Sequence, residues 1–121
     1  MSRAPRLRFR LDALAISMSG LCLLHCLLLP ALLVLAPSLA AWFMLPDSFH
    51  IWAVVIAVPT SIVSLGLGRR RHHRWAPTLL ALPGLLGLIA SVALATGLAM
   101  ETAVTVAGAL LLAAAHLLNL R

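Results

Sequence analysis

Four long apolar runs divide the chain, and short clusters of charged and turn-forming residues separate them. The runs cover residues 11–36, 50–68, 77–98 and 102–120. Each approaches or exceeds the roughly 20 residues that an α-helix needs to cross a hydrocarbon core of about 30 Å. None alternates apolar and polar residues as barrel strands do, and lipid offers no partners to an open backbone. The pattern predicts an all-α polytopic membrane protein, a four-transmembrane-helix bundle forming one domain over residues 1–121.

The charged residues give the predicted bundle an orientation. All nine basic residues are arginines, and they precede the first run, separate the second from the third, or end the chain: Arg3, Arg6, Arg8, Arg10, Arg69, Arg70, Arg71, Arg74 and Arg121. Positively charged loops favour the cytoplasmic side of a membrane. Both termini are therefore expected in the cytoplasm, with Asp47 and Glu101 on the other side of the membrane.

Composition narrows the function classes. Apolar residues make up 63% of the chain and charged residues 10%, so four crossings leave no room for an extramembrane catalytic domain, and no enzyme activity is expected. The sequence pI of about 11.7 comes from arginines beside membrane spans, which favours contact with lipid headgroups over nucleic acid. The first run exceeds the roughly 7 to 15 residues of a signal-peptide core, so an uncleaved first helix is predicted.

The segment Ser19–Pro30 carries the side chains with the most distinctive chemistry. It holds the two cysteines of the chain, Cys22 and Cys26, together with His25. At helical spacing all three project from one face near the middle of the first span, and the same face continues back to Asp12. Thiol and imidazole groups at that depth need partners, water or an ion.

Two thiolates and an imidazole are ligands for soft or borderline ions such as Zn(II), Cu(I) and, by the same softness argument, Hg(II). Pro30 has no N–H to offer the Cys26 carbonyl, which leaves that carbonyl as a further potential ligand. Two alternatives stay open. The cysteines can pack as small apolar side chains, or Cys22 and Cys26 can form a disulfide for thiol exchange, although the chain lacks a partner thiol.

The remaining histidines extend the predicted site. His50 and His116 continue stripes of small residues on the second and fourth helices and are expected to face the first helix, as successive sites for a permeating ion. Alternatively, His50 caps a helix and His116 bonds to a neighbouring one. His72 and His73 are expected in a solvated turn. The candidate metal ligands are Cys22, His25, Cys26, His50 and His116.

These features together resemble the MerC family of bacterial mercury-resistance membrane proteins. The resemblance is carried by Asp12, Ser19–Pro30, Phe49–Trp52, the arginine-rich turn and Ala115–Asn119. It implies a four-helix inner-membrane protein that takes Hg(II) from the periplasmic side, binds it at the first-helix cysteines and delivers it to the cytoplasm for reduction. Better-known members carry a further cysteine pair near the C-terminus, whereas this sequence resembles a short member with no cysteine after Cys26.

The expected function is uptake of a soft or borderline metal ion by ligand exchange, with Hg(II) favoured and Zn(II) or Cu(I) as alternatives. No resident cofactor is required. The expected partners are the lipid bilayer and the metal ion, a periplasmic metal carrier is a candidate, and the oligomeric state stays open. The alternative function is a non-transporting membrane subunit, or an accessory protein that holds haem or metal with structural histidines.

Overall fold

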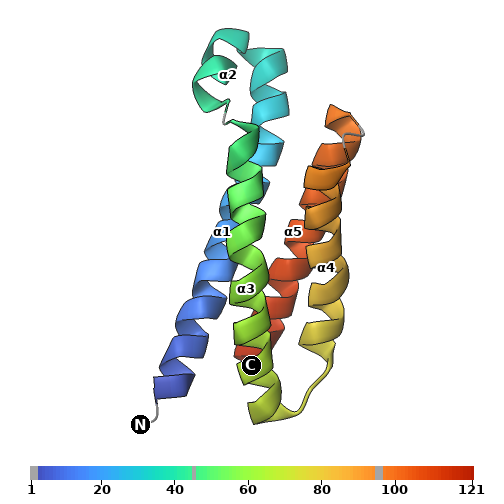
Figure 1. The fold of residues 1–121 in the computed structure, drawn as a ribbon. Helices are drawn as coiled ribbons and strands as arrows, with labels where there is room; N and C mark the ends of the chain where they lie inside the picture. The colour runs from blue at the N-terminus through green and yellow to red at the C-terminus, as the bar shows by residue number, and fades with distance from the viewer. Residues whose placement is uncertain (1–2, 45, 95–96) are drawn as a thin grey trace.

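The computed structural model describes residues 3–44, 46–94 and 97–121, and side chains 4, 30 and 47 lie outside the described part. The roles predicted for the side chains of Pro30 and Asp47 therefore lie outside it too. The described ranges form five α-helices and no strand (Figure 1): α1 (Arg3–Leu35), α2 (Pro37–Phe43), α3 (Asp47–His72), α4 (Ala76–Ala93) and α5 (Leu98–Leu120). Four of them, α1, α3, α4 and α5, are long and apolar enough to cross a membrane. The predicted all-α bundle is confirmed.

Helices α1 and α3 extend beyond the apolar runs into charged sequence. Helix α1 already begins in the basic arm, at Arg3, and α3 continues through residues 69–72, where the apolar pattern predicted a turn. Arginine is a good helix former, and positive charge is favourable at a helix C-terminus. Helix α3 ends at His72, and the next residue, His73, caps it: its backbone is left-handed (φ 51°) and its N–H donates to the Arg69 carbonyl at 2.9 Å.

The boundary between the last two helices also differs from the predicted one. Helix α4 ends at Ala93 rather than at residue 98. Gly97 precedes α5 with φ 99°, a conformation that glycine adopts without steric cost. The predicted outer loop contains the short helix α2, and Glu101 lies in the first turn of α5, where negative charge complements the helix dipole.

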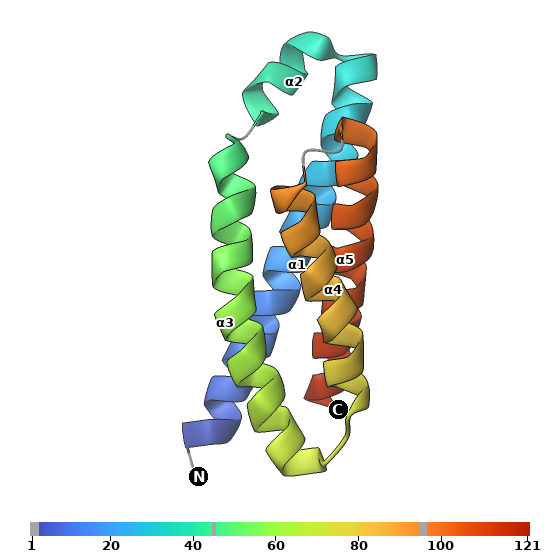
Figure 2. The ribbon, with the colours of Figure 1, turned by 45° about the vertical axis from the view of Figure 1, so that its right-hand side comes forward.

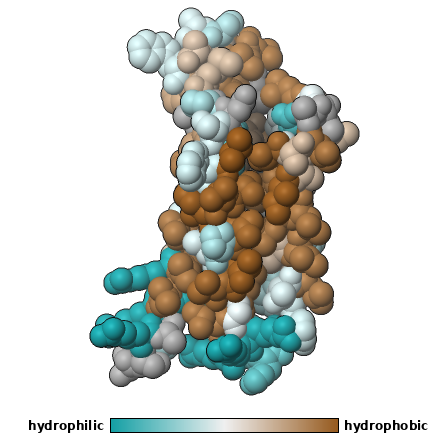
Figure 3. Space-filling model, viewed as in Figure 1, coloured by the Kyte–Doolittle hydropathy of each residue, from teal (hydrophilic) through white to brown (hydrophobic). Residues whose placement is uncertain are grey.

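The four long helices form an antiparallel bundle in which α1 packs against α3 and α5, and α4 packs against α5 and α3 (Figures 1 and 2). Both termini and the α3–α4 connection lie at one end, and α2 lies at the other. A belt of apolar side chains covers the face seen in Figure 3, with hydrophilic residues gathered at the end that carries the termini. Outward-facing leucines such as Leu24 and Leu27, each 60% exposed, suit contact with lipid. The chain is a multi-pass membrane protein.

Small and polar residues make up much of the bundle interior, beside a cluster of the buried leucines Leu65, Leu88 and Leu112. Helices α4 and α5 meet at Gly84 and Gly108, where a Cβ added to Gly108 would lie 2.9 Å from the Gly84 carbonyl oxygen. Such close approach is how helices associate in lipid, where packing replaces the hydrophobic effect. The fully buried side chains of α1, α3 and α5 include five polar ones: Asp12, Ser61, Ser64, His116 and Asn119.

Candidate metal centre

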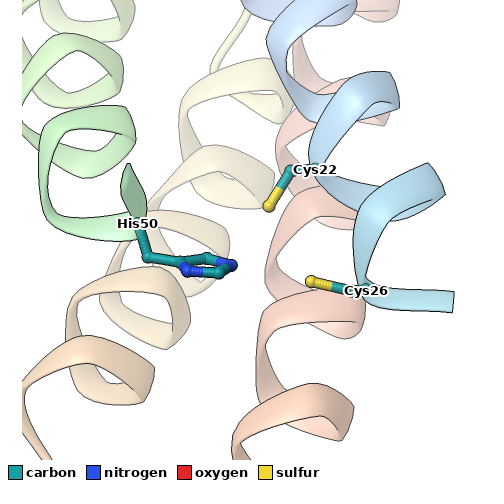
Figure 4. Close-up of side chains that lie close together, drawn as sticks. All are labelled: Cys22, Cys26 and His50. Carbon is teal, nitrogen blue, oxygen red and sulfur yellow. The ribbon is translucent and has the colours of Figure 1, made fainter. Parts of the chain in front are cut away.

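Three potential metal ligands converge between α1 and α3. The thiol sulfurs of Cys22 and Cys26 and a ring nitrogen of His50 all lie within 4.8 Å of one another (Figure 4). Cys26 is buried, Cys22 and His50 are half-buried, and both thiols are free. Sulfur and imidazole nitrogen are the donors that soft and borderline cations prefer. The arrangement is suited to binding one such cation.

Helix geometry explains why these three side chains meet. Cys22 and Cys26 are four residues apart on α1, so both project from the same face of one rigid helix. His50 lies in the first turn of α3, which runs antiparallel to α1 and starts close to the level of Cys26. A cation bound here would link α1 to α3, two helices that the chain connects through α2 at that end of the bundle.

The structure places His50, rather than the adjacent His25, in the thiol cluster. The His25 ring lies with its centroid 5.8 Å from that of His50 and 6.2 Å from that of Phe49. Neighbouring residues on a helix point about 100° apart, so His25 diverges from Cys26. The predicted grouping of Cys22, His25 and Cys26 therefore becomes Cys22, Cys26 and His50, with a second imidazole nearby.

The cluster lies where two cavities between the helices meet. The outer cavity, of about 320 Å³, is lined by His25, Cys26, Glu101 and others; His25 and Cys26 lie on the half of α1 that leads to α2, and Glu101 lies in the first turn of α5. The narrow cavity, of about 40 Å³, is lined by Cys22 and Ser19 among others and has room for about one water molecule. His50 lines both cavities. A cation held at the cluster can therefore contact either cavity.

His116, predicted as a further ligand, belongs to a separate polar network. It is fully buried on α5; its Nδ1 lies 2.5 Å from Asp12 Oδ1, and its Nε2 lies 3.1 Å from Ser61 Oγ. Both ring nitrogens are engaged in this arrangement, which leaves neither for a metal ion. The structure thus does not bring His116 to the thiols, although Asp12 shares the buried face of α1 as the sequence predicted.

Two residues that the sequence analysis did not assign to a site complete this network. Asn119 Nδ2 donates to Asp12 Oδ2 at 2.9 Å, and Ser64 Oγ donates to Asp12 Oδ1 at 2.5 Å. At the basic end, His72 Nε2 lies 3.1 Å from Asn119 Oδ1, and Arg8 Nη1 donates to the Asn119 carbonyl at 2.9 Å. His72 thus contacts the bundle instead of lying in a solvated turn. The available signal for Asn119 was its position one helical turn after His116, which puts the two polar side chains on the same face of α5.

Comparison with known families identifies the chain. A family model described as MerC mercury resistance protein matches residues 12–121, a range that includes Asp12, both cysteines, His50 and His116. No match was found among curated proteins or among solved structures. The family is associated with mercury resistance and membrane transport and is not a known enzyme family. With the match covering nearly its whole length, the chain belongs to the MerC family of mercury resistance proteins.

Proposed function

We propose that the protein binds Hg(II) at Cys22, Cys26 and His50 and carries it across the bacterial inner membrane toward the cytoplasm. The observation that carries the proposal is the convergence of two free thiols and an imidazole at the junction of two cavities. Soft thiolate ligands select soft cations, and imidazole accepts a wider range of metals. Membership of a mercury resistance family supports Hg(II) as the cargo over Zn(II) or Cu(I).

Loading of the site is a ligand exchange without electron transfer. Hg(II) arrives bound to two thiolates of small carrier molecules. Bonds form from Hg(II) to the sulfurs of Cys22 and Cys26 while the two carrier bonds break, and the departing thiolates take up the two cysteine protons. In this proposal His50, whose ring nitrogen lies within 4.8 Å of both sulfurs, holds the ion as a third ligand between these steps. The reverse exchange releases the ion, because sites in a permeation path must not bind too tightly.

The charge distribution supports an inward direction. The arginine-bearing ends of the helices lie at the end of the bundle that carries both termini, and positive charge favours the cytoplasmic side. The outer cavity then lies toward the periplasm, with the half-buried Glu101 carboxylate on its wall to attract a cation. From the cluster, the narrow cavity extends along α1 past Ser19 toward the cytoplasmic half of the bundle.

Uptake into proteoliposomes tests this function. Hg(II) is offered as a complex with a charged small thiol, because neutral mercuric species cross lipid unaided, and Zn(II) and Cu(I) are offered in parallel. Wild-type protein should take up Hg(II), and the Cys22→Ser/Cys26→Ser variant should not. His73→Asn is the control for a substitution outside the cluster and should take up Hg(II) as the wild type does. His73 is exposed, and asparagine tolerates its left-handed backbone.

The outcomes separate the two function classes. Equal uptake of every ion by the wild type and the double serine variant would refute transport through this site. Stoichiometric Hg(II) binding without uptake would instead indicate an accessory metal-binding protein. Uptake of Zn(II) or Cu(I) in preference to Hg(II) would reassign the cargo and leave the site in place.

A further inference from the structure

A carboxyl group and an imidazole are sealed inside the membrane-spanning part of the bundle. Asp12 and His116 are each 0% exposed and lie within the spans Pro5–Leu35 and Leu98–Leu120. Ionisable groups at such positions are costly, and where they persist they mark ion pathways and proton relays. The thiol cluster makes no use of this pair, so its presence calls for a separate explanation.

The contacts of Asp12 and His116 allow the pair to bind a proton. Asp12 Oδ1 and His116 Nδ1 are 2.5 Å apart, a hydrogen-bond distance at which the carboxylate and the imidazole can hold a proton between them. The other His116 nitrogen faces Ser61 Oγ at 3.1 Å, and a hydroxyl can either donate to a bare nitrogen or accept from a protonated one. The pair can therefore gain or lose a proton without leaving a buried polar atom unsatisfied.

The surroundings of the pair connect it to the basic end of the bundle. Asn119 from α5 and Ser64 from α3 both donate to the Asp12 carboxylate. The charged or titratable groups facing this cluster are Arg8 from α1 and His72 from α3, which both contact Asn119. Helix α4 contains no titratable residue. His72 is half-buried and lies in the last turn of α3, so a short series of polar side chains, Asn119 and His72, leads from the pair to the end of the bundle.

The same face of α1 connects this pair to the metal centre. Between Asp12 and Cys22 the buried positions are Ala15 and Ser19, which are 5% and 6% exposed, and both line the narrow cavity. Asp12 and Cys22 are ten residues apart on α1, which corresponds to about 15 Å along the helix axis. A cation that leaves Cys22 toward the basic end therefore approaches Asp12, and its positive charge acts directly on the proton held there.

We propose that the Asp12–His116 pair is a proton-binding site whose proton is exchanged during each transport cycle, so that metal movement is coupled to a proton gradient. This inference rests on the proposed function of the thiol cluster. The ligand of the second site is the proton itself. The pair responds to a passing cation through charge and contributes no ligand to the Cys22–Cys26–His50 cluster.

The test uses proteoliposomes with the same concentration of the Hg(II)–thiol complex on both sides. Isotopic exchange of Hg(II) across the membrane measures transport alone, and net accumulation after a pH gradient of one unit, imposed in either polarity, measures coupling. One proton per ion corresponds to an accumulation ratio of about tenfold, since one pH unit is a tenfold difference in proton activity. The accumulation ratio of the wild type should exceed that of Asp12→Asn by about this factor. Asp12→Asn should still bind and exchange Hg(II), and Asp12→Glu should restore accumulation.

Each result decides a different point. Exchange by wild type without any response to the gradient overturns the coupling and leaves the proposed function intact. Accumulation by Asp12→Asn equal to that of wild type, after normalisation to its exchange rate, removes the pair from the mechanism. Absence of exchange in wild type refutes the transport function and the coupling with it. If Asp12→Asn does not fold, His116→Gln takes its place, and the wild-type measurement alone still decides whether coupling exists.

Discussion

Gly68 on α3 leaves the space that the carboxamide of Asn119 on α5 occupies. A Cβ added at Gly68 would lie 2.6 Å from Asn119 Cγ and 2.8 Å from its Nδ2. That carboxamide donates to the Asp12 carboxylate and to the Ser64 carbonyl, so it cannot turn aside without breaking these bonds. The buried polar network therefore depends on the absence of a side chain at Gly68.

Gly68→Ala should lower the stability of the bundle by about 1–3 kcal/mol, the usual cost of overpacking a filled interior. The matched control is Gly66→Ala on the same helix, where an added Cβ meets nothing within 4 Å. Alanine there should leave stability unchanged or raise it slightly, because alanine favours helix over glycine by about 1 kcal/mol. Thermal unfolding in detergent compares the two variants, and equal midpoints would contradict the tight fit.

A second glycine contact holds α4 against α5. Gly108→Ala should separate these helices, because the added Cβ would lie 2.9 Å from the Gly84 carbonyl oxygen, a backbone atom that cannot rotate away. The expected loss is again about 1–3 kcal/mol. Gly87→Ala is the control, since its Cβ would make only ordinary contacts from 3.7 Å outward. Unfolding midpoints in detergent report the difference, and tolerance of Gly108→Ala would argue against this interface.

The fold followed from the sequence because one physical constraint dominates it. Lipid requires apolar helices of a certain length, and the four runs met that requirement. Helix ends were less predictable, since α3 continues into the arginines at 69–71, which are both charged and good helix formers. Hydropathy marks where lipid contact stops, whereas backbone hydrogen bonds continue until a residue such as His73 turns left-handed.

The candidate site was only partly predictable for a related reason. Spacing along one helix placed Cys22 and Cys26 on a common face, and the structure agrees. Which histidine joins them depends on how far α3 slides along α1, and periodicity contains no such information. The buried contacts of His116 likewise depend on the register of three helices, so its engagement with Asp12 instead of the thiols emerged only from the fold.

The two histidines near the thiols should differ in their effect on Hg(II) affinity. His50→Ala should weaken binding by about tenfold, the lower end of what loss of a supporting metal-site residue costs. His25→Ala should change affinity much less, because His25 lies outside the group within 4.8 Å. Titration of the near-ultraviolet Hg–thiolate absorption in detergent measures both, with Cys22→Ser/Cys26→Ser as the blank. A larger loss for His25→Ala would favour the grouping predicted from sequence.

Membrane orientation decides whether the proposed transport is uptake or export. Single cysteines at Ser38 on α2 and at Arg74 in the α3–α4 connection, both exposed, report opposite ends of the bundle in a Cys22→Ser/Cys26→Ser background. An impermeant maleimide added to intact spheroplasts should label Ser38→Cys at once and Arg74→Cys only after permeabilisation, because the arginines favour the cytoplasm. The reversed pattern would place Glu101 and the outer cavity in the cytoplasm, and the thiols would then receive their cargo from inside the cell.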